Sequence, residues 1–221
     1  VELQIPTSDL RWVHGWMVQQ YFYRRRKNFL KANEVLSKVL KVTDGVVGTR
    51  EVRARAWLGL GGIHRLKGEP EEARLYLNKV LQHGMDDISI LSRTMDEMGV
   101  LELAYGNHIL AAQFFEGALK YAEKLDNKDE EFRVRQNMAG VYRRQGDTDT
   151  AHTHLSAALK HHRKTGSKQS QARCLNDLAE LDRFTGNWVE AEEGYRQALA
   201  ILSAVGDQRF FTAGLNLGII Y

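Results

Sequence analysis

Apolar and small residues recur along this chain in a pattern that repeats at intervals of about 40 residues. Four glycines hold the same place in the pattern: Gly68, Gly106, Gly146 and Gly186. Each is followed by an alanine after five residues, a large apolar residue after nine, and a small or branched residue and a leucine after twelve and thirteen. Positions with this spacing lie on one face of a helix. The pattern therefore predicts one amphipathic helix after each glycine.

The segment before each glycine carries a second stripe of the same kind. Seven and eight residues upstream of the glycine stands a large residue followed by a small one, in the pairs Leu60-Gly61, Met98-Gly99, Met138-Ala139 and Leu178-Ala179. We expect the small residue to leave room for a neighbouring helix. No sustained period of two is present, so strands are not favoured. Each repeat is therefore predicted to contain two helices joined by a short turn.

The residues in the turns agree with this interpretation. A glycine at the end of the first helix readily adopts the left-handed conformation that often ends a helix. Pro70 follows Gly68 at the expected start of the next helix, where a missing N–H has no cost. Asp147, Thr148 and Asn187 are predicted N-caps of later helices.

The repeat extends weakly in both directions. Lys27 takes the place of the turn glycine one repeat earlier, and Trp16 takes the place of Trp57. At the other end a first helix begins, but the sequence stops at Tyr221 before its turn. We therefore expect a lead-in over residues 1–12 and a single array over 13–221. The expected repeats are 13–52, 54–91, 92–131, 132–171, 172–210 and a half repeat 211–221.

This pattern resembles the tetratricopeptide repeat. The residues that carry the resemblance most clearly are Leu178-Ala179, Gly186, Ala191, Tyr195 and Ala198-Leu199. The usual repeat has about 34 residues, and the longer repeat here is similar to those of kinesin light chains, Pins and bacterial regulators of the Rap and MalT type. The resemblance implies an all-α fold, a right-handed α-solenoid of tandem antiparallel helix pairs.

The resemblance also implies a function, since family members bind peptides or partner domains. We expect a non-catalytic protein–protein interaction scaffold. The alternative is a ligand- or peptide-sensing regulatory domain of a larger signalling or transcription regulator. The start at Val1 without methionine and the stop within a repeat leave room for additional domains in the parent protein.

Arginines recur on the first helices, which in the resembling family line the concave wall. Thirteen residues before the turn stand Arg55, Arg93, Arg133 and Arg173. Three residues before the turn stand Arg65, Arg143 and Arg183, with Arg144 on the same side and with Arg24 if Lys27 marks the first turn. Guanidinium groups bind carboxylates with two parallel hydrogen bonds, and a wall of one charge sign attracts the opposite charge. We expect these arginines to bind an acidic segment of another protein or peptide.

A structural role for the same arginines stays open. Arginine forms helices well and often only solvates a surface. Four carboxylates lie close to the arginines in repeat register and are candidates to neutralise some of them: Asp96, Glu102, Glu180 and Asp182.

Composition narrows the possible classes of protein, ligand and compartment. Charged residues make up 27% and hydrophobic residues 43% of the 221 residues, as in an ordinary folded protein. A net charge of +3 does not by itself indicate nucleic-acid binding, and the aromatic and basic run 21–27 is interpreted as core and covering residues. We find no apolar run long enough to span a membrane. The single cysteine, Cys174, fits a reducing compartment, so we expect a cytoplasmic protein.

We expect no catalytic site, cofactor or metal site. No base is specified for Cys174, which is interpreted as a core residue. The segment 59–62 resembles part of a phosphate loop but lacks its Gly-Lys-Ser/Thr ending. Helical zinc ligands usually stand three or four residues apart. The histidines of the fourth repeat do not have this spacing: His152, His154, His161 and His162.

Overall fold

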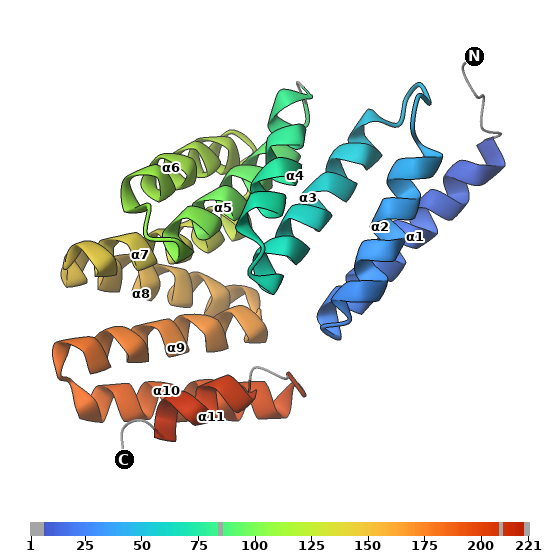
Figure 1. The fold of residues 1–221 in the computed structure, drawn as a ribbon. Helices are drawn as coiled ribbons and strands as arrows, with labels where there is room; N and C mark the ends of the chain where they lie inside the picture. Colours follow the sequence, from blue (N-terminus) through green and yellow to red (C-terminus); the bar gives the residue numbers. More distant parts are fainter. Residues whose placement is uncertain (1–6, 84–85, 208–209, 219–221) are drawn as a thin grey trace. The chain divides into compact units, whose positions relative to one another are not determined.

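A computed structural model describes residues 7–83, 86–207 and 210–218, and the secondary structure of these ranges is helical (Figure 1). Residues 1–6 of the expected lead-in and 219–221 of the expected half repeat lie outside this part. The helices are α1 (Thr7–Arg25), α2 (Phe29–Val42), α3 (Arg50–Lys67), α4 (Pro70–Gln82), α5 (Ile88–Ala104), α6 (His108–Lys124), α7 (Lys128–Gln145), α8 (Thr148–Thr165), α9 (Lys168–Thr185), α10 (Trp188–Ala204) and α11 (Phe210–Gly218). The predicted all-α class and its tandem helix pairs are confirmed.

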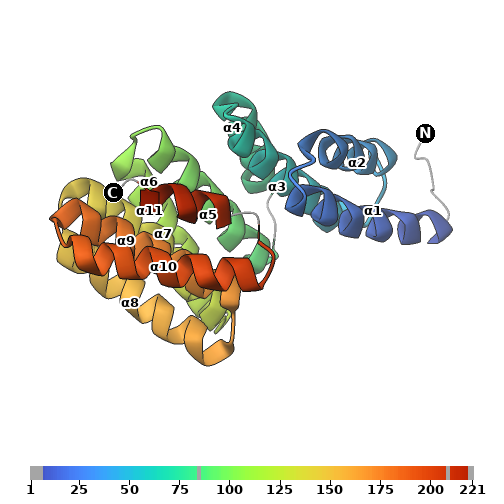
Figure 2. The same ribbon diagram turned by 90° about the horizontal axis from the view of Figure 1, so that it is seen from below.

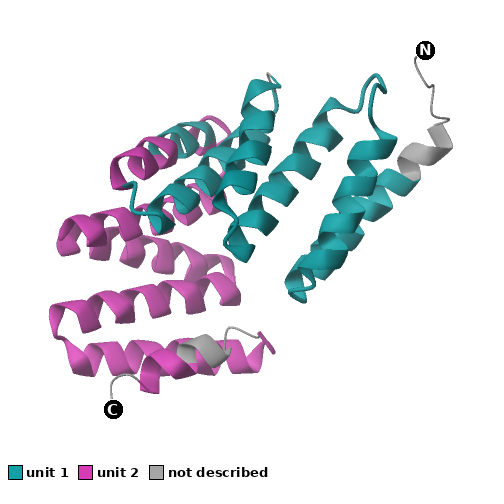
Figure 3. Ribbon diagram, in the orientation of Figure 1, with its two compact units in different colours: residues 1–107, 116–121 teal, residues 108–115, 122–221 magenta. Residues whose placement is uncertain are grey.

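The helices form two compact units, shown in Figure 3. Unit 1 contains residues 1–107 and 116–121, and unit 2 contains 108–115 and 122–221. In unit 1, α1 packs on α2, α3 packs on α4, and α5 packs against both α3 and α4. In unit 2, α7 packs on α8, and α9 packs on both α8 and α10 (Figures 1 and 2). Helices that follow one another along the chain run antiparallel within each unit, as the sequence predicted (Figure 1).

The predicted turn chemistry is present. Helix α3 ends at Gly68, whose φ of 77° is left-handed, and α4 begins at Pro70. Lys27 has a φ of 54°, so it adopts the conformation of the glycine that it replaces. The positive φ agrees with a turn at Lys27 in the weak first repeat.

The predicted caps occupy the expected ends of the helices. Asp147 is the N-cap of α8 and accepts a hydrogen bond from the Thr150 N–H at 3.1 Å. Asn187 holds the N-cap position of α10, and Thr148 is the first residue of α8. The sequence thus placed both helix starts within one residue.

Most residues of each repeat in unit 2 belong to its helices, and few belong to its turns. Helices α7, α8 and α9 contain 18 residues each. Only residues 146–147 and 166–167 separate them. The repeat of about 40 residues therefore comes from long helices in this region, and the link between repeats stays short.

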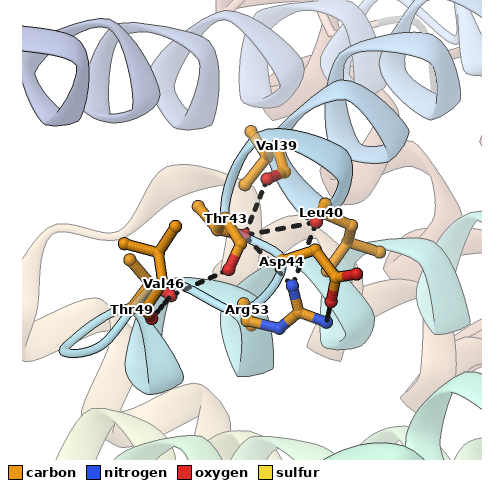
Figure 4. A network of polar contacts seen from close by, with 7 residues as sticks. All are labelled: Val39, Leu40, Thr43, Asp44, Val46, Thr49 and Arg53. Carbon is orange, nitrogen blue, oxygen red and sulfur yellow. Dashed lines mark hydrogen bonds and ion pairs between the residues drawn. The ribbon is translucent and has the colours of Figure 1, made fainter. Parts of the chain in front are cut away.

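The link between α2 and α3 is longer and is held by polar contacts (Figure 4). The Thr43 hydroxyl donates to a carbonyl oxygen one turn earlier at 2.7 Å, and the Thr49 hydroxyl donates to the Thr43 carbonyl at 3.1 Å. Arg53 donates to the Leu40 carbonyl at 3.0 Å and forms an ion pair with Asp44 at 3.1 Å. Both threonines are buried, so their hydrogen bonds satisfy groups that water does not reach.

The predicted apolar stripes form the core, and the small residues allow helices to approach closely. In α4, Ala73, Leu77 and Val80 are fully buried. A Cβ atom added at Gly61 of α3 would lie 2.7 Å from both Cγ and Cδ2 of Leu77. The small position in the large-small pair thus receives the side chain of the next helix, as expected.

Replacing Gly61 with alanine is expected to lower the free energy of unfolding by about 1–3 kcal/mol, because the added Cβ would overlap the fully buried Leu77 side chain. Gly15 in α1 is the matched control, since it is exposed and nothing lies within 4 Å of an added Cβ. Gly15→Ala is expected to raise stability by up to about 1 kcal/mol through helix propensity alone. Urea denaturation of both variants measures the difference, and equal signs would contradict the close approach.

Candidate functional site

Three arginines of unit 1 lie close to one another, and two of them interact with one carboxylate. Arg65 of α3 donates from Nε to Glu97 Oε2 of α5 at 2.8 Å. Burial lowers the pKa of Arg24 of α1, Glu97 raises it, and the charges of Arg65 and Arg93 lower it. Arg24, Arg65 and Arg93 therefore lie close enough to act on one another electrostatically, with Glu97 among them. We call these four residues the arginine cluster.

A glycine makes room for this cluster. A Cβ atom added at Gly62 of α3 would lie 2.9 Å from Arg24 Nη2 and 3.7 Å from Glu97 Oε1. The absence of a side chain at Gly62 thus lets the Arg24 guanidinium approach α3. The cluster holds three positive charges and one negative charge, so it carries a local excess of positive charge.

A related but smaller group lies in unit 2. Arg143 of α7 forms an ion pair with Glu180 of α9 at 3.1 Å. Arg183 of α9 shares a hydrogen bond with the Tyr195 hydroxyl of α10. Burial raises the pKa of Tyr195, and this hydrogen bond lowers it. Arg143, Arg183 and Glu180 therefore all lie close enough to Tyr195 to act on it electrostatically.

Two arginines of the row that stands thirteen residues before the turn have carboxylate partners nearby. Arg55 donates to Glu51 in its own helix at 2.8 Å and to Asp87, the N-cap of α5, at 3.2 Å. Arg133 forms an ion pair with Glu130 one turn earlier in α7. The charge of this part of the row is largely balanced within the protein.

The other arginines, in that row and beside the second one, either have partners within the protein or are exposed. Arg173 of α9 donates to the Asn137 side-chain oxygen of α7, and its Nε lies 3.9 Å from Asp177. Arg93 and Arg144 are exposed. The eight predicted arginines thus divide into a clustered group in unit 1, a smaller group in unit 2, residues paired with local partners, and the exposed Arg144.

The sequence did not single out Glu97 or Gly62. Glu97 stands four residues after Arg93 in α5, a spacing that places both on one helix face. That spacing was the available signal, but it does not reveal the approach of Arg24 and Arg65. Of the carboxylates considered in advance, Glu180 does pair with a predicted arginine, whereas Glu102 pairs with Arg74 of α4.

Cys174 is placed as a core residue. Its side chain is fully buried, and burial raises the pKa of its thiol to about 12. The thiolate is the nucleophilic form, so this cysteine is unsuited to covalent catalysis at neutral pH.

In the described part of the chain, no helix combines the length and apolar character needed to cross a membrane.

Antiparallel helix pairs in tandem, joined by a left-handed turn at Lys27 in the first pair and at a glycine in the later ones, define an α-helical repeat protein. Tetratricopeptide repeat models match residues 90–164 and 132–204, and a second model of the same description matches residues 21–88. The chain therefore belongs to the tetratricopeptide repeat family, as the sequence pattern predicted. This family typically supplies non-catalytic interaction scaffolds. No curated protein matches the chain in sequence.

Several solved structures share the fold. PlcR from Bacillus thuringiensis, in complex with the peptide PapR7 and DNA, has a TM-score of 0.80 and 16% identity over 96% of this chain and 76% of its own. A Rap protein complexed with Competence and Sporulation Factor has a TM-score of 0.79 and 16% identity, covering 100% of this chain and 62% of its own. The predicted likeness to the longer Rap-type repeats is confirmed.

A third neighbour is a larger signalling protein. It is a signal transduction ATPase from Pyrococcus horikoshii with a tetratricopeptide repeat sensor. The TM-score is 0.72 at 16% identity, over 95% of this chain and 32% of that one. The chain thus spans about a third of this neighbour, and at such identities the likeness concerns the fold alone.

Proposed function

We propose that this chain is a non-catalytic scaffold that holds an acidic segment of a partner protein, with the arginine cluster as its main anchor. Family membership supports the scaffold role, and so do two neighbours, PlcR solved with the peptide PapR7 and Rap solved with Competence and Sporulation Factor. The observation that supports the acidic preference is the grouping of three arginines with a single carboxylate, Glu97. A partner carboxylate would balance the excess positive charge there.

The partly buried setting strengthens this preference. Arg24 loses part of its hydration, which lowers its pKa, and Arg65 is only 21% exposed. Charges attract more strongly where water is partly excluded. Arg93 is exposed at the edge of the cluster and gives an acidic side chain access to it.

The other predicted arginines are proposed as additional contacts, one in unit 1 and five in unit 2. They are Arg55, Arg133, Arg143, Arg144, Arg173 and Arg183. Each guanidinium has five N–H donors, so an arginine with one internal partner keeps donors for a second carboxylate. We propose that these residues contribute weaker, salt-sensitive contacts, since exposed ion pairs are screened by added salt.

Replacing Arg93 with glutamate is expected to weaken binding of an acidic peptide by about tenfold, which corresponds to about 1.4 kcal/mol. The probe is a fluorescein-labelled Glu-rich peptide, and its glutamine-substituted twin measures binding that does not depend on charge. Fluorescence anisotropy at low and high salt reads the affinity. The wild-type protein should prefer the Glu-rich peptide, and this preference should fall with salt.

Lys120→Glu is the matched control, because it changes the net charge equally on an exposed position of α6 in the same unit. It is expected to leave the affinity within about twofold, as for most surface charges. Equal losses for both variants, or equal affinity for the two peptides, would contradict an acidic partner. The scaffold role itself is tested by affinity capture from native lysate, where the absence of any reproducible partner would count against it.

The alternative function is a peptide-sensing domain of a larger signalling or transcription regulator. The likeness to PlcR and to the tetratricopeptide repeat sensor of an archaeal ATPase favours it. A DNA-binding or ATPase domain encoded in the same gene would support this function. A complete gene that encodes only further tetratricopeptide repeats would favour the simple scaffold.

A further inference from the structure

Unit 2 brings two histidines and a carboxylate together where α7 begins and α8 ends. His161 and His162 lie in α8 and Asp129 in α7. His161 Nε2 lies 2.6 Å from Asp129 Oδ1. Each of the three residues offers one ligand atom, and these atoms lie within 4.8 Å of one another. We call these residues the His-Asp cluster.

His162 gives a second, independent indication of a ligand. Its side chain is 4% exposed, and neither ring nitrogen has a hydrogen-bond partner in the described part of the chain. A buried polar group without a partner costs free energy, so such groups are uncommon and call for an explanation. Burial is the main cause that lowers the pKa of His162. Metal binding would use a lone pair on one of these ring nitrogens.

The rings of the cluster are held in place by packing. Phe132, one turn after Asp129 in α7, stacks on His161 with ring centroids 4.5 Å apart. The His161 and His162 rings meet edge to face at 5.4 Å. Ligands that are fixed in this way bind a metal ion without a large loss of side-chain freedom.

The charges near His162 shift its pKa in opposite directions. Asp129 raises the pKa of His162, whereas the charges of His161 and Arg173 lower it. The carboxylate of Asp129 is therefore the group that makes a cation acceptable here. Asp129 is exposed, so the cluster opens to solvent on that side.

We propose that Asp129, His161 and His162 bind a divalent transition-metal ion of the zinc class. Two imidazoles and one carboxylate match the donors that Zn²⁺ and its neighbours accept, whereas Ca²⁺ and Mg²⁺ prefer oxygen ligands alone. Three protein ligands leave a coordination position for water or for a side chain of a partner. This site is independent of the arginine cluster in unit 1.

The sequence pattern does not indicate this site, because the histidines of one helix are not spaced as metal ligands. Adjacent histidines on a helix point in different directions, and that spacing is not a metal motif. The third ligand comes from the preceding helix, 32 residues before His161. Only the packing of α7 on α8 brings it there.

The test is a Zn²⁺ titration of the protein after treatment with a chelator and dialysis. Isothermal calorimetry should show one equivalent bound, and Co²⁺ in place of Zn²⁺ should give the visible absorption of a protein-coordinated ion. Asp129→Asn is the main variant, since Asp129 is exposed and the change is not expected to affect folding. It should weaken Zn²⁺ binding at least tenfold, because the loss of even a residue that supports a ligand costs 10- to 100-fold.

His161→Ala should weaken binding similarly, with circular dichroism to verify that the helices persist. His152→Ala is the matched control, because His152 is an exposed histidine of the same helix. It should leave both affinity and stoichiometry unchanged. Failure of the wild-type protein to bind Zn²⁺, or equal affinity of the Asp129→Asn variant and the wild type, would overturn the proposal.

Discussion

Replacing Arg74 with methionine is expected to lower the free energy of unfolding by about 3 kcal/mol, because it leaves a buried carboxylate without its counter-charge. Glu102 in α5 is 1% exposed. Arg74 of α4 donates to both of its oxygens, at 2.7 and 3.1 Å, and the Asn107 amide donates at 2.6 Å. Methionine keeps much of the volume and apolar stem of arginine but supplies no donor.

The same contact makes stability depend on pH. The hydrogen bond from Arg74 is the largest cause that lowers the pKa of Glu102. A group whose pKa is lower in the folded protein stabilises it above the unfolded pKa and loses this contribution as pH falls through the folded pKa. The wild-type protein should therefore lose this contribution in acid, and the Arg74→Met variant should lack that loss.

Urea denaturation at neutral and acidic pH measures both effects. Glu71→Gln is the matched control, since Glu71 is an exposed partner of the same arginine at 2.7 Å. This change is expected to cost less than about 1 kcal/mol, as for surface ion pairs. A cost for Arg74→Met as small as that of the control would show that Glu102 does not depend on the guanidinium.

Replacing Tyr195 with alanine is expected to lower the free energy of unfolding by about 3–5 kcal/mol, the usual cost of removing a buried aromatic ring. Tyr195 in α10 is 1% exposed and packs with Ala179 and Ala191, with Leu217 against them. Two of these neighbours are alanines, whose short side chains fill little of the space that the ring leaves. The cavity would therefore persist.

Tyr195→Phe keeps the ring and removes the hydroxyl, so it separates their contributions to stability. The hydroxyl shares a hydrogen bond with Arg183, so its loss is expected to cost about 1 kcal/mol. Chemical denaturation followed by circular dichroism compares the two variants. If both lost the same amount, the hydroxyl and not the packed ring would be the source of stability at this position.

The sequence by itself determined the helices and their register. Burial on one face of a helix needs apolar residues at fixed offsets, and a left-handed turn favours glycine. Both signals are local, so Gly68, Pro70 and Asp147 marked helix ends correctly. The repetition of these signals also identified the family, and it placed Lys27 at a left-handed turn although the residue there is not glycine.

Only the tertiary structure decided which charged side chains meet. The arginines were visible as rows, and Asp177 holds the register of Glu97 two repeats later, but the contact of Glu97 with Arg65 depends on how α5 is rotated against α3. The meeting of Asp129 with His161 likewise depends on the packing of α7 on α8. A rotation of one helix by a single residue turns a side chain through about 100°. Local sequence therefore fixes where a residue stands on its helix, whereas its partner on the next helix is fixed by packing.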